Sequence, residues 1–155
     1  MKKLILATAI LIGLSGVAQA KIELKGWYWG KPMDRAYIKV NETIADVPAV
    51  WQILADIKAP TLKATSISIT FKSEYFNDVK AALITKYKLV CETRKVQNRM
   101  GATFLAEDCM YEEDGDTLLL NKFSEKLTQS AIWIYNNKDL EKSSKESVEK
   151  RNKDL

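Results

Sequence analysis

The sequence predicts an α+β fold, in which an antiparallel β-meander sheet carries one amphipathic helix packed on one of its faces. Two adjacent patterns support this class. Residues 65–71 alternate strictly between polar and apolar side chains, as a half-buried strand does. Residues 74–87 then repeat apolar side chains at helical spacing. The side chains expected to pack together are Ile67, Ile69 and Phe71 on the strand and Phe76, Val79 and Leu83 on the helix.

The chain begins with the pattern of a secretory signal peptide. Lys2 and Lys3 give a positive start, residues 4–17 carry no charge, and small residues precede the expected cleavage site after Ala20. The apolar run is shorter than the roughly 20 residues that a membrane-spanning helix needs, so an N-terminal anchor is the less favoured alternative. We therefore expect an exported, periplasmic protein that starts at Lys21 and has no membrane span after cleavage.

Cleavage would leave a chain of about 135 residues, the usual size of one domain, which we place at 21–137. Loss of Lys2 and Lys3 lowers the formal net charge of +4 by two. So small and evenly spread a charge gives no reason to expect nucleic acid as a partner. Residues 138–155 alternate acidic and basic side chains with few apolar ones, so this charged tail is expected to be a frayed helix or disordered.

The segment before the helix is expected to form a hairpin. Residues 47–57 fit either a helix or a strand. We favour a strand that enters a hairpin with residues 62–71 through the turn at Ala59-Pro60. Ser73 is expected to be the N-cap of the helix, because a serine hydroxyl can accept a hydrogen bond from a backbone N–H of the first turn.

Short strands are predicted after the helix. Asp114-Gly115 is a strong hairpin signal, since both residue types tolerate the positive φ of a tight turn. Residues 131–135 are apolar on both faces, which is typical of a central or covered strand. The predicted strands are residues 88–96, 101–111, 117–123 and 130–136.

Cys91 and Cys109 are the two cysteines of the chain, and in an oxidising compartment they are expected to form a disulfide. They lie on neighbouring predicted strands, so their Cα atoms should be about 4.4–6.8 Å apart. Closing this loop should stabilise the fold by roughly 3 kcal/mol. A redox or nucleophilic thiol is the less favoured alternative, because the spacing is not that of a C-x-x-C motif and the chain has no histidine.

An enzyme is not indicated by the remaining polar residues, and we predict no catalytic residues, no metal and no cofactor. The chain has no histidine, the usual catalytic base near neutral pH. The pairs Glu107-Asp108 and Glu112-Glu113 could suggest a glycosidase, but neighbours on a strand point to opposite faces. The acidic residues 112–116 could suggest calcium, but the positions that follow carry the wrong ligands.

The residues of greatest functional interest are three aromatic side chains between two glycines near the expected mature N-terminus. Trp27, Tyr28 and Trp29, with nearby Lys31, could line a site for a peptide or a sugar, because rigid aromatic rings give a large contact area. The favoured alternative is that they fill the core or cover a sheet edge. Trp51 and Trp133 are expected in the core.

One resemblance adds to these patterns. The chain resembles a pattern found in small, exported, uncharacterised proteobacterial proteins, some of them from phage or prophage regions. The resemblance is carried by residues 67–71, 76–83, Lys86-Tyr87 and 96–104. The resemblance covers residues 62–136. It implies export and a helix packed on a β-meander, and it brings no catalytic residues.

Three classes of function remain open. The favoured one is a non-enzymatic periplasmic binding or inhibitory protein that acts through a protein–protein surface on another envelope or phage-derived protein, with Trp27, Tyr28, Trp29 and Lys31 contributing to the contact. The second is a carbohydrate- or envelope-binding module that uses the same tryptophans. The third is an unrecognised hydrolase.

Overall fold

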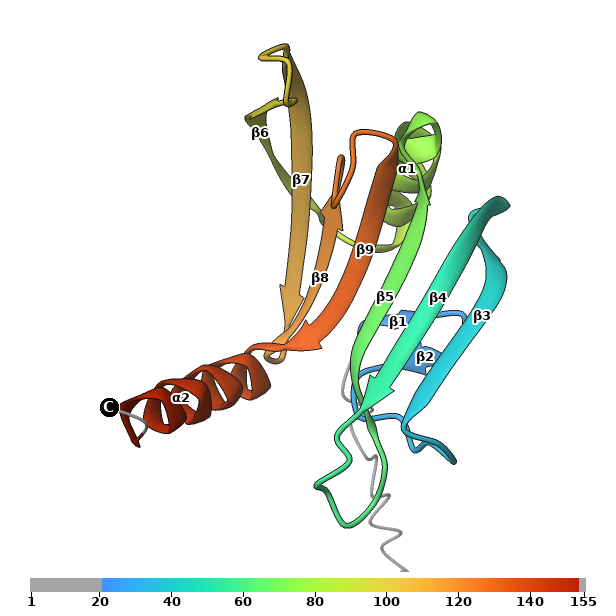
Figure 1. Ribbon diagram of the computed structural model, residues 1–155. Coiled ribbons are helices and arrows are strands. Elements are labelled where there is room, and N and C mark those ends of the chain that lie inside the picture. The colour runs from blue at the N-terminus through green and yellow to red at the C-terminus, as the bar shows by residue number, and fades with distance from the viewer. Residues whose placement is uncertain (1–20, 154–155) are drawn as a thin grey trace, which may run out of the picture.

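The computed structural model describes residues 21–153 as one α+β domain, which confirms the predicted class (Figure 1). Seven antiparallel strands form one sheet in the order β3-β4-β5-β9-β8-β7-β6, and β1 and β2 form a separate pair. The predicted signal peptide at residues 1–20 lies outside the described residues. The strands are β1 Glu23–Leu24, β2 Trp27–Tyr28, β3 Tyr37–Ile44, β4 Val47–Ala55, β5 Ala64–Lys72, β6 Val90–Gln97, β7 Thr103–Glu113, β8 Asp116–Asn121 and β9 Gln129–Asn136; the α-helices are α1 Phe76–Lys86 and α2 Asn137–Lys153.

The sheet consists of two meanders joined through α1. Strands β3, β4 and β5 follow one another, α1 then crosses one face of the sheet, and β6 to β9 return so that β9 pairs with β5. The register places Ile67 opposite Ile134 and Ile69 opposite Ile132. β9 is therefore the central strand of the sheet, as its apolar composition predicts.

The hydrophobic core lies between one face of the sheet and α1, with the β1–β2 pair closing one end. The six residues predicted to pack together, from Ile67 on β5 to Leu83 on α1, all belong to a single buried cluster. Ile22 and Leu24 enter the same cluster from the N-terminal segment. Tyr87, just after α1, donates its hydroxyl proton to the carbonyl oxygen of Glu23 at 2.7 Å and so ties the two parts together.

The start of the helix differs from the prediction. A 3-10 turn at Ser73–Tyr75 precedes α1, and no side-chain hydrogen bond caps this turn or α1. The hydroxyl of Ser73 instead accepts a hydrogen bond from the hydroxyl of Ser130 on β9, at 3.0 Å. Ser73 therefore joins the helix entry to the sheet, and its prediction as an N-cap is wrong.

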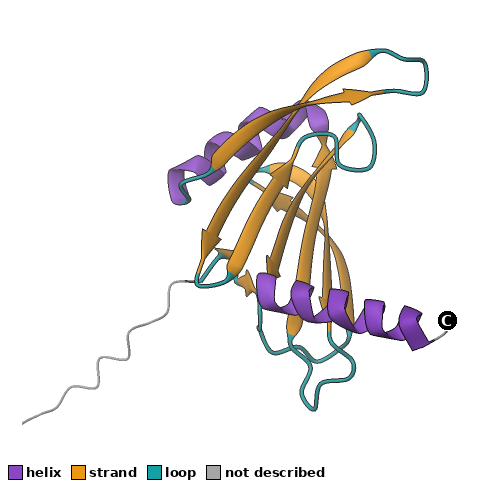
Figure 2. Cartoon of the chain, turned by 90° about the vertical axis from the view of Figure 1, so that its left-hand side faces the viewer, coloured by secondary structure: helices purple, strands orange, loops and turns teal. Residues whose placement is uncertain are grey.

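The other local predictions are largely confirmed. Residues 47–55 form a strand, β4, as favoured. Asp114 and Gly115 form the two-residue turn between β7 and β8, with φ of 52° and 87°. The charged tail is helical, as α2, over Asn137–Lys153. Figure 2 shows α2 in front of the sheet and α1 behind it, so the two helices lie on opposite faces.

Candidate functional site

The face of the sheet that α1 does not cover, which we call the open face, carries its own aromatic and apolar side chains. Residues of a strand alternate between the two faces. Ile132 and Ile134 of β9 are buried in the core, so Trp133 and Tyr135 point to the open face. The register places Leu119 of β8 directly beside Trp133. Trp133 is half-buried there, and its predicted place in the core is wrong.

A cleft of about 1030 Å³ lies in the angle between the open face and α2. Trp133, Tyr135 and Leu119 form its floor. α2 forms one wall, on which Leu140 is half-exposed, and the loop between β4 and β5 forms the other, with Pro60. Its volume is at the upper end of the range usual for ligand pockets, and its floor is apolar while both walls carry charges.

The first turn of α2 is held by hydrogen bonds from two directions. The backbone N–H of Asn137 donates to the carbonyl of Gly115 at 2.9 Å, and Thr117 donates its hydroxyl to Asn137 Oδ1 at 3.0 Å. From the N-terminal segment, Trp29 Nε1 donates to Asp139 Oδ2 at 3.0 Å. These contacts fix the wall of the cleft where it meets the sheet. Asp139 also lies in the first helical turn, where the helix dipole favours a negative charge.

A second cavity of about 680 Å³ adjoins the first and shares Asp56, Pro60 and Asp139 with it. It is more polar, and its lining brings Lys21 and Lys63 close to several carboxylates. One of these, Asp116, is nearly buried. Burial raises the pKa of the Asp116 carboxyl above its ordinary value of 3.8, although the hydrogen bond from Asn136 Nδ2 at 2.8 Å opposes this shift.

The three aromatic residues predicted as a contact surface have three different surroundings. Trp27 packs against the core, and Lys31 Nζ lies 4.4 Å from the centroid of its ring. Tyr28 has Lys21 Nζ 4.3 Å from its ring centroid. Trp29 lies in the turn after β2, lines the second cavity and donates its Nε1–H to Asp139. None of the four predicted residues lines the cleft itself. Trp29 comes nearest to it, because it lines the adjoining cavity and bonds to Asp139, which lines both.

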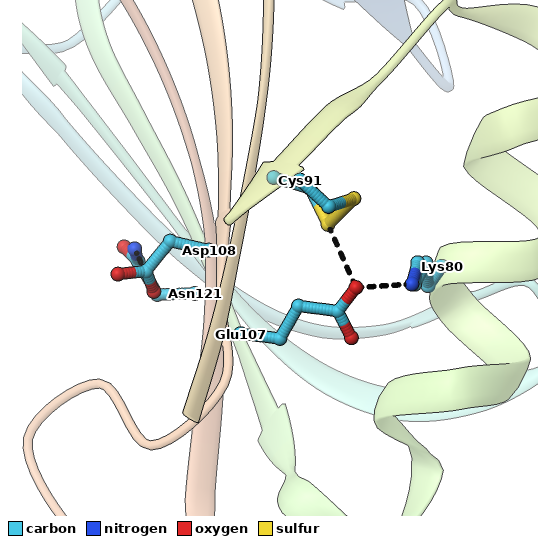
Figure 3. Close-up of a disulfide and its surroundings, with 6 residues drawn as sticks. Lys80, Cys91, Glu107, Asp108 and Asn121 are labelled. Carbon is cyan, nitrogen blue, oxygen red and sulfur yellow. Dashed lines mark hydrogen bonds and ion pairs between the residues drawn. A yellow bond between two sulfur atoms is a disulfide. The ribbon is translucent and has the colours of Figure 1, made fainter. Parts of the chain in front are cut away.

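The predicted disulfide is present and links β6 to β7. Cys91 and Cys109 are direct register partners, with an S–S distance of 2.07 Å. Their Cα atoms are 3.9 Å apart, less than the predicted 4.4–6.8 Å. Figure 3 shows Glu107 beside this disulfide, where it forms an ion pair with Lys80 of α1 and so holds the helix against β7.

The adjacent carboxylates Glu107 and Asp108 do not converge. Glu107 points toward α1, whereas Asp108 points to the other side of β7 and accepts a hydrogen bond from Asn121 Nδ2 at 2.8 Å (Figure 3). Glu107 also lies within 4.8 Å of both cysteine sulfurs, a grouping of metal-ligand types. The two sulfurs are bonded to each other and so offer no thiolate to a metal.

Neither a protein-family model, nor a curated protein, nor a solved structure matches this chain. Among the described residues, no helix combines the length and apolar character needed to cross a membrane.

The cleft was not predicted from the sequence, although one signal pointed to it. Residues 131–135 are apolar on both faces, so a second buried or binding surface was implied on the side opposite the core. The second wall carried no comparable signal. α2 has few apolar side chains, and its position depends on contacts with Gly115, Thr117 and Trp29, which are distant in the sequence.

Proposed function

We propose that this chain is a non-enzymatic, exported binding protein that engages another protein through the cleft between the open face and α2. The observation that carries the proposal is the aromatic floor of Trp133 and Tyr135 between two charged walls. Aromatic side chains in a concave setting are the usual anchors of protein interfaces. The chain has no histidine, so binding without turnover is the function that its side chains support best.

A protein segment suits this surface better than a sugar because exposed apolar side chains recur on the open face beyond the cleft. Tyr135 is followed across the sheet by Ser66, Leu54 and Tyr37 in one row of register partners. Leu54 and Tyr37 are 48% and 46% exposed. The walls present both signs of charge, so the expected partner inserts apolar side chains flanked by charged ones. Export and the resemblance described above suggest an envelope or phage-derived protein.

The carbohydrate alternative was based on Trp27, Tyr28 and Trp29, and the surroundings of these rings weaken it. Stacking of a sugar requires an accessible aromatic face. Lys31 occupies the region above the Trp27 ring, and Lys21 occupies the region above the Tyr28 ring. Retention on peptidoglycan or glycan beads would nevertheless favour this alternative over a protein partner.

Export rests on the signal-peptide pattern and is supported by the disulfide, because such bonds persist mainly in oxidising compartments. The intact mass of the protein recovered from a secreting host tests it. A mature form that begins at Lys21 is expected, and a mass that retains residues 1–20 would contradict cleavage.

Two matched substitutions test the binding surface. Leu140→Glu places a charge at the wall of the cleft, and Ile84→Glu places the same charge on the outer side of α1. The two side chains are 50% and 51% exposed and both lie on helices. We expect a stoichiometric partner from a periplasmic extract, confirmed with the purified pair, to lose binding to Leu140→Glu by about tenfold or more and to bind Ile84→Glu unchanged. Equal binding to both variants would reject the cleft as the site.

Single serine substitutions separate the predicted aromatic contacts from structural roles. Trp27→Ser should lower the stability of the domain, because Trp27 packs against the core. Trp29→Ser should leave the domain folded and weaken partner binding, since Trp29 lines the adjoining cavity and holds the α2 wall of the cleft through Asp139. A folded Trp29→Ser variant that binds as well as the parent would exclude Trp29 from the contact.

A further inference from the structure

Within the part of the chain that the structure describes, β6 is an open edge of the sheet. It is the last strand in the order and pairs with β7 on one side only. Figures 1 and 2 show the β6–β7 hairpin extending past the ends of the other strands. On its open face the hairpin exposes three apolar side chains, Val90 at 69%, Met110 at 43% and Phe104 at 37%. An exposed strand edge of this kind offers backbone hydrogen-bonding groups to another chain.

The position of the cysteines indicates which backbone groups point outward. The Cα separation of 3.9 Å between Cys91 and Cys109 is nearer to the roughly 4.5 Å of ladder pairs that exchange no backbone hydrogen bonds than to the roughly 5.5 Å of pairs that do. The hydrogen bond from Asn98 N–H to the carbonyl of Ala102 agrees, because alternation along the strand from this bonded pair makes Cys91 and Cys109 a non-bonded pair. The backbone N–H and C=O groups of Cys91 therefore point away from β7. Because the direction of these groups alternates along a strand, the backbone groups of Thr93 and Lys95 also point away from β7.

We propose that a second copy of this chain pairs with β6 in an antiparallel manner, about a two-fold axis at Thr93, so that the two sheets become continuous. In this register Glu92 lies directly opposite Arg94 of the second copy, and the symmetry repeats the pair. Val90 lies opposite Val96 of the second copy, again twice. An interface of this kind is self-complementary, as two-fold symmetry requires, and opposite charges across strands favour pairing.

The charges select this register over its neighbours. Two residues that face each other across an antiparallel pair must point to the same face of the sheet. The two-fold axis must therefore pass through a residue and not between two residues, so it can move only from one residue to the next. A shift to Glu92 would place two copies of this carboxylate opposite each other. A shift to Arg94 would place two guanidinium groups opposite each other. Like charges directly opposed destabilise a strand pair, so the axis at Thr93 is favoured.

Glu92 also lacks a favourable partner within its own chain. Its register partner on β7 is Asp108, a like charge, and among the described residues no ion pair or hydrogen bond involves the Glu92 side chain. Arg94 bonds to Asp108 through Nε and to the carbonyls of Lys122 and Phe123 through Nη2. A guanidinium group has five N–H donors, so Arg94 retains donors for Glu92 of the second copy.

The same register covers the exposed apolar side chains of the hairpin. Within one chain Val90 is the register partner of Met110, and Val96 is that of Phe104. Pairing Val90 with Val96 of the second copy would create one apolar row, from Met110 of one copy to Phe104 of the other. The contact is short, so a weak dimer with a dissociation constant of roughly 10 μM to 1 mM is expected.

The opposite edge, β3, does not show this complementarity. An axis at Val40 would place Lys39 opposite Asn41 of the second copy. An axis at Asn41 would place Lys39 opposite Thr43. Neither register creates an ion pair. Glu42, the other charged residue of β3, is already bonded to Lys25 at 3.1 Å. β3 therefore provides a control edge.

Sedimentation equilibrium on the disulfide-bonded protein tests the proposal, which is independent of the proposed cleft partner. Glu92→Arg should weaken the dimer about tenfold or more, because the new arginine of each copy would face Arg94 of the other copy. The exchange Glu92→Arg with Arg94→Glu should restore it, since it reverses both members of each pair. Lys39→Glu on β3 should leave it unchanged. A monomer at all concentrations up to about 1 mM, or a dimer that Glu92→Arg does not weaken, would overturn the proposal.

A second measurement tests the register without any substitution. In a dimer of mixed isotope-labelled and unlabelled chains, a methyl–methyl NOE between Val90 and Val96 is expected. Within one chain these residues are separated by roughly 20 Å along the strand, too far for such a signal. A dimer without this intermolecular NOE would exclude pairing about Thr93.

Discussion

Replacement of Leu83 by alanine tests how α1 is seated on the sheet. Leu83 is 4% exposed and belongs to the core cluster, whereas the next residue, Ile84, is 51% exposed. Removing the buried carbons beyond Cβ loses about 2 kcal/mol of transfer free energy. The cavity left behind raises the expected loss in the free energy of unfolding to about 2–5 kcal/mol. Ile84→Ala should lower it by less than about 1 kcal/mol.

Urea unfolding followed by circular dichroism and tryptophan fluorescence measures both variants. The midpoint should fall for Leu83→Ala with an unchanged slope, because the same surface is exposed on unfolding. In a thermal melt the corresponding fall in Tm is on the order of 10 °C for a chain of this size. Equal losses for the two variants, or a larger loss for Ile84→Ala, would show that the inferred buried side of α1 is wrong.

Three further predictions concern other parts of the fold. Replacing Cys91 and Cys109 by serine should lower the free energy of unfolding by about 3 kcal/mol; urea curves that coincide with the parent's would contradict this. The pKa of Asp116 is raised by burial and that of Asp34 is lowered by its hydrogen bond with Arg35, so carboxyl NMR should show Asp116 titrating at the higher pH. Because the folded protein favours protonated Asp116, the contribution of this carboxyl to stability is present at low pH and is lost as pH rises through its folded pKa. An Asp116→Asn variant whose free energy of unfolding depends on pH as the parent's does would refute this. Trp29→Phe should speed amide hydrogen exchange in the first turn of α2 with little change in global stability, and unchanged exchange would exclude the Trp29–Asp139 contact as a support of the helix.

The parts of the fold predicted from the sequence are those specified by neighbouring residues. The alternation of residues 65–71 and the helical spacing after it specify β5, α1 and the side on which they meet. Asp114-Gly115 specifies a turn whose two residues both have positive φ. The disulfide was predicted from the two cysteines together with the signal-peptide pattern.

The elements that were missed had weaker or non-local signals. β3 alternates Ile38, Val40 and Ile44 with polar residues, but its hairpin to β4 turns at Ala45 and Asp46, with φ of 50° and 62°. Alanine is not a typical residue for that conformation, so the turn was not recognised. The β1–β2 pair has two residues in each strand and is held by distant contacts such as that of Glu23 with Tyr87.

Trp133 shows why a side chain could be assigned to the wrong face. In β9 the two isoleucines at 132 and 134 occupy the core face, and alternation then sends Trp133 outward. The choice between the two faces is made by pairing with Ile69 and Ile67 of β5, which lie more than sixty residues away. Large apolar size alone suggested the core. The register, which the sequence does not contain locally, decides that Trp133 is available on the open face.

The open face also relates the two proposals geometrically. One row of register partners runs from Trp133 through Leu119 and Met110 to Val90 at the β6 edge. A two-fold axis perpendicular to the sheet leaves both open faces on the same side of the dimer. The clefts of the two copies would then face the same direction at opposite ends of one continuous sheet. Such an arrangement favours partners that are themselves repeated on a surface, because two weak contacts made together bind far more tightly than either alone.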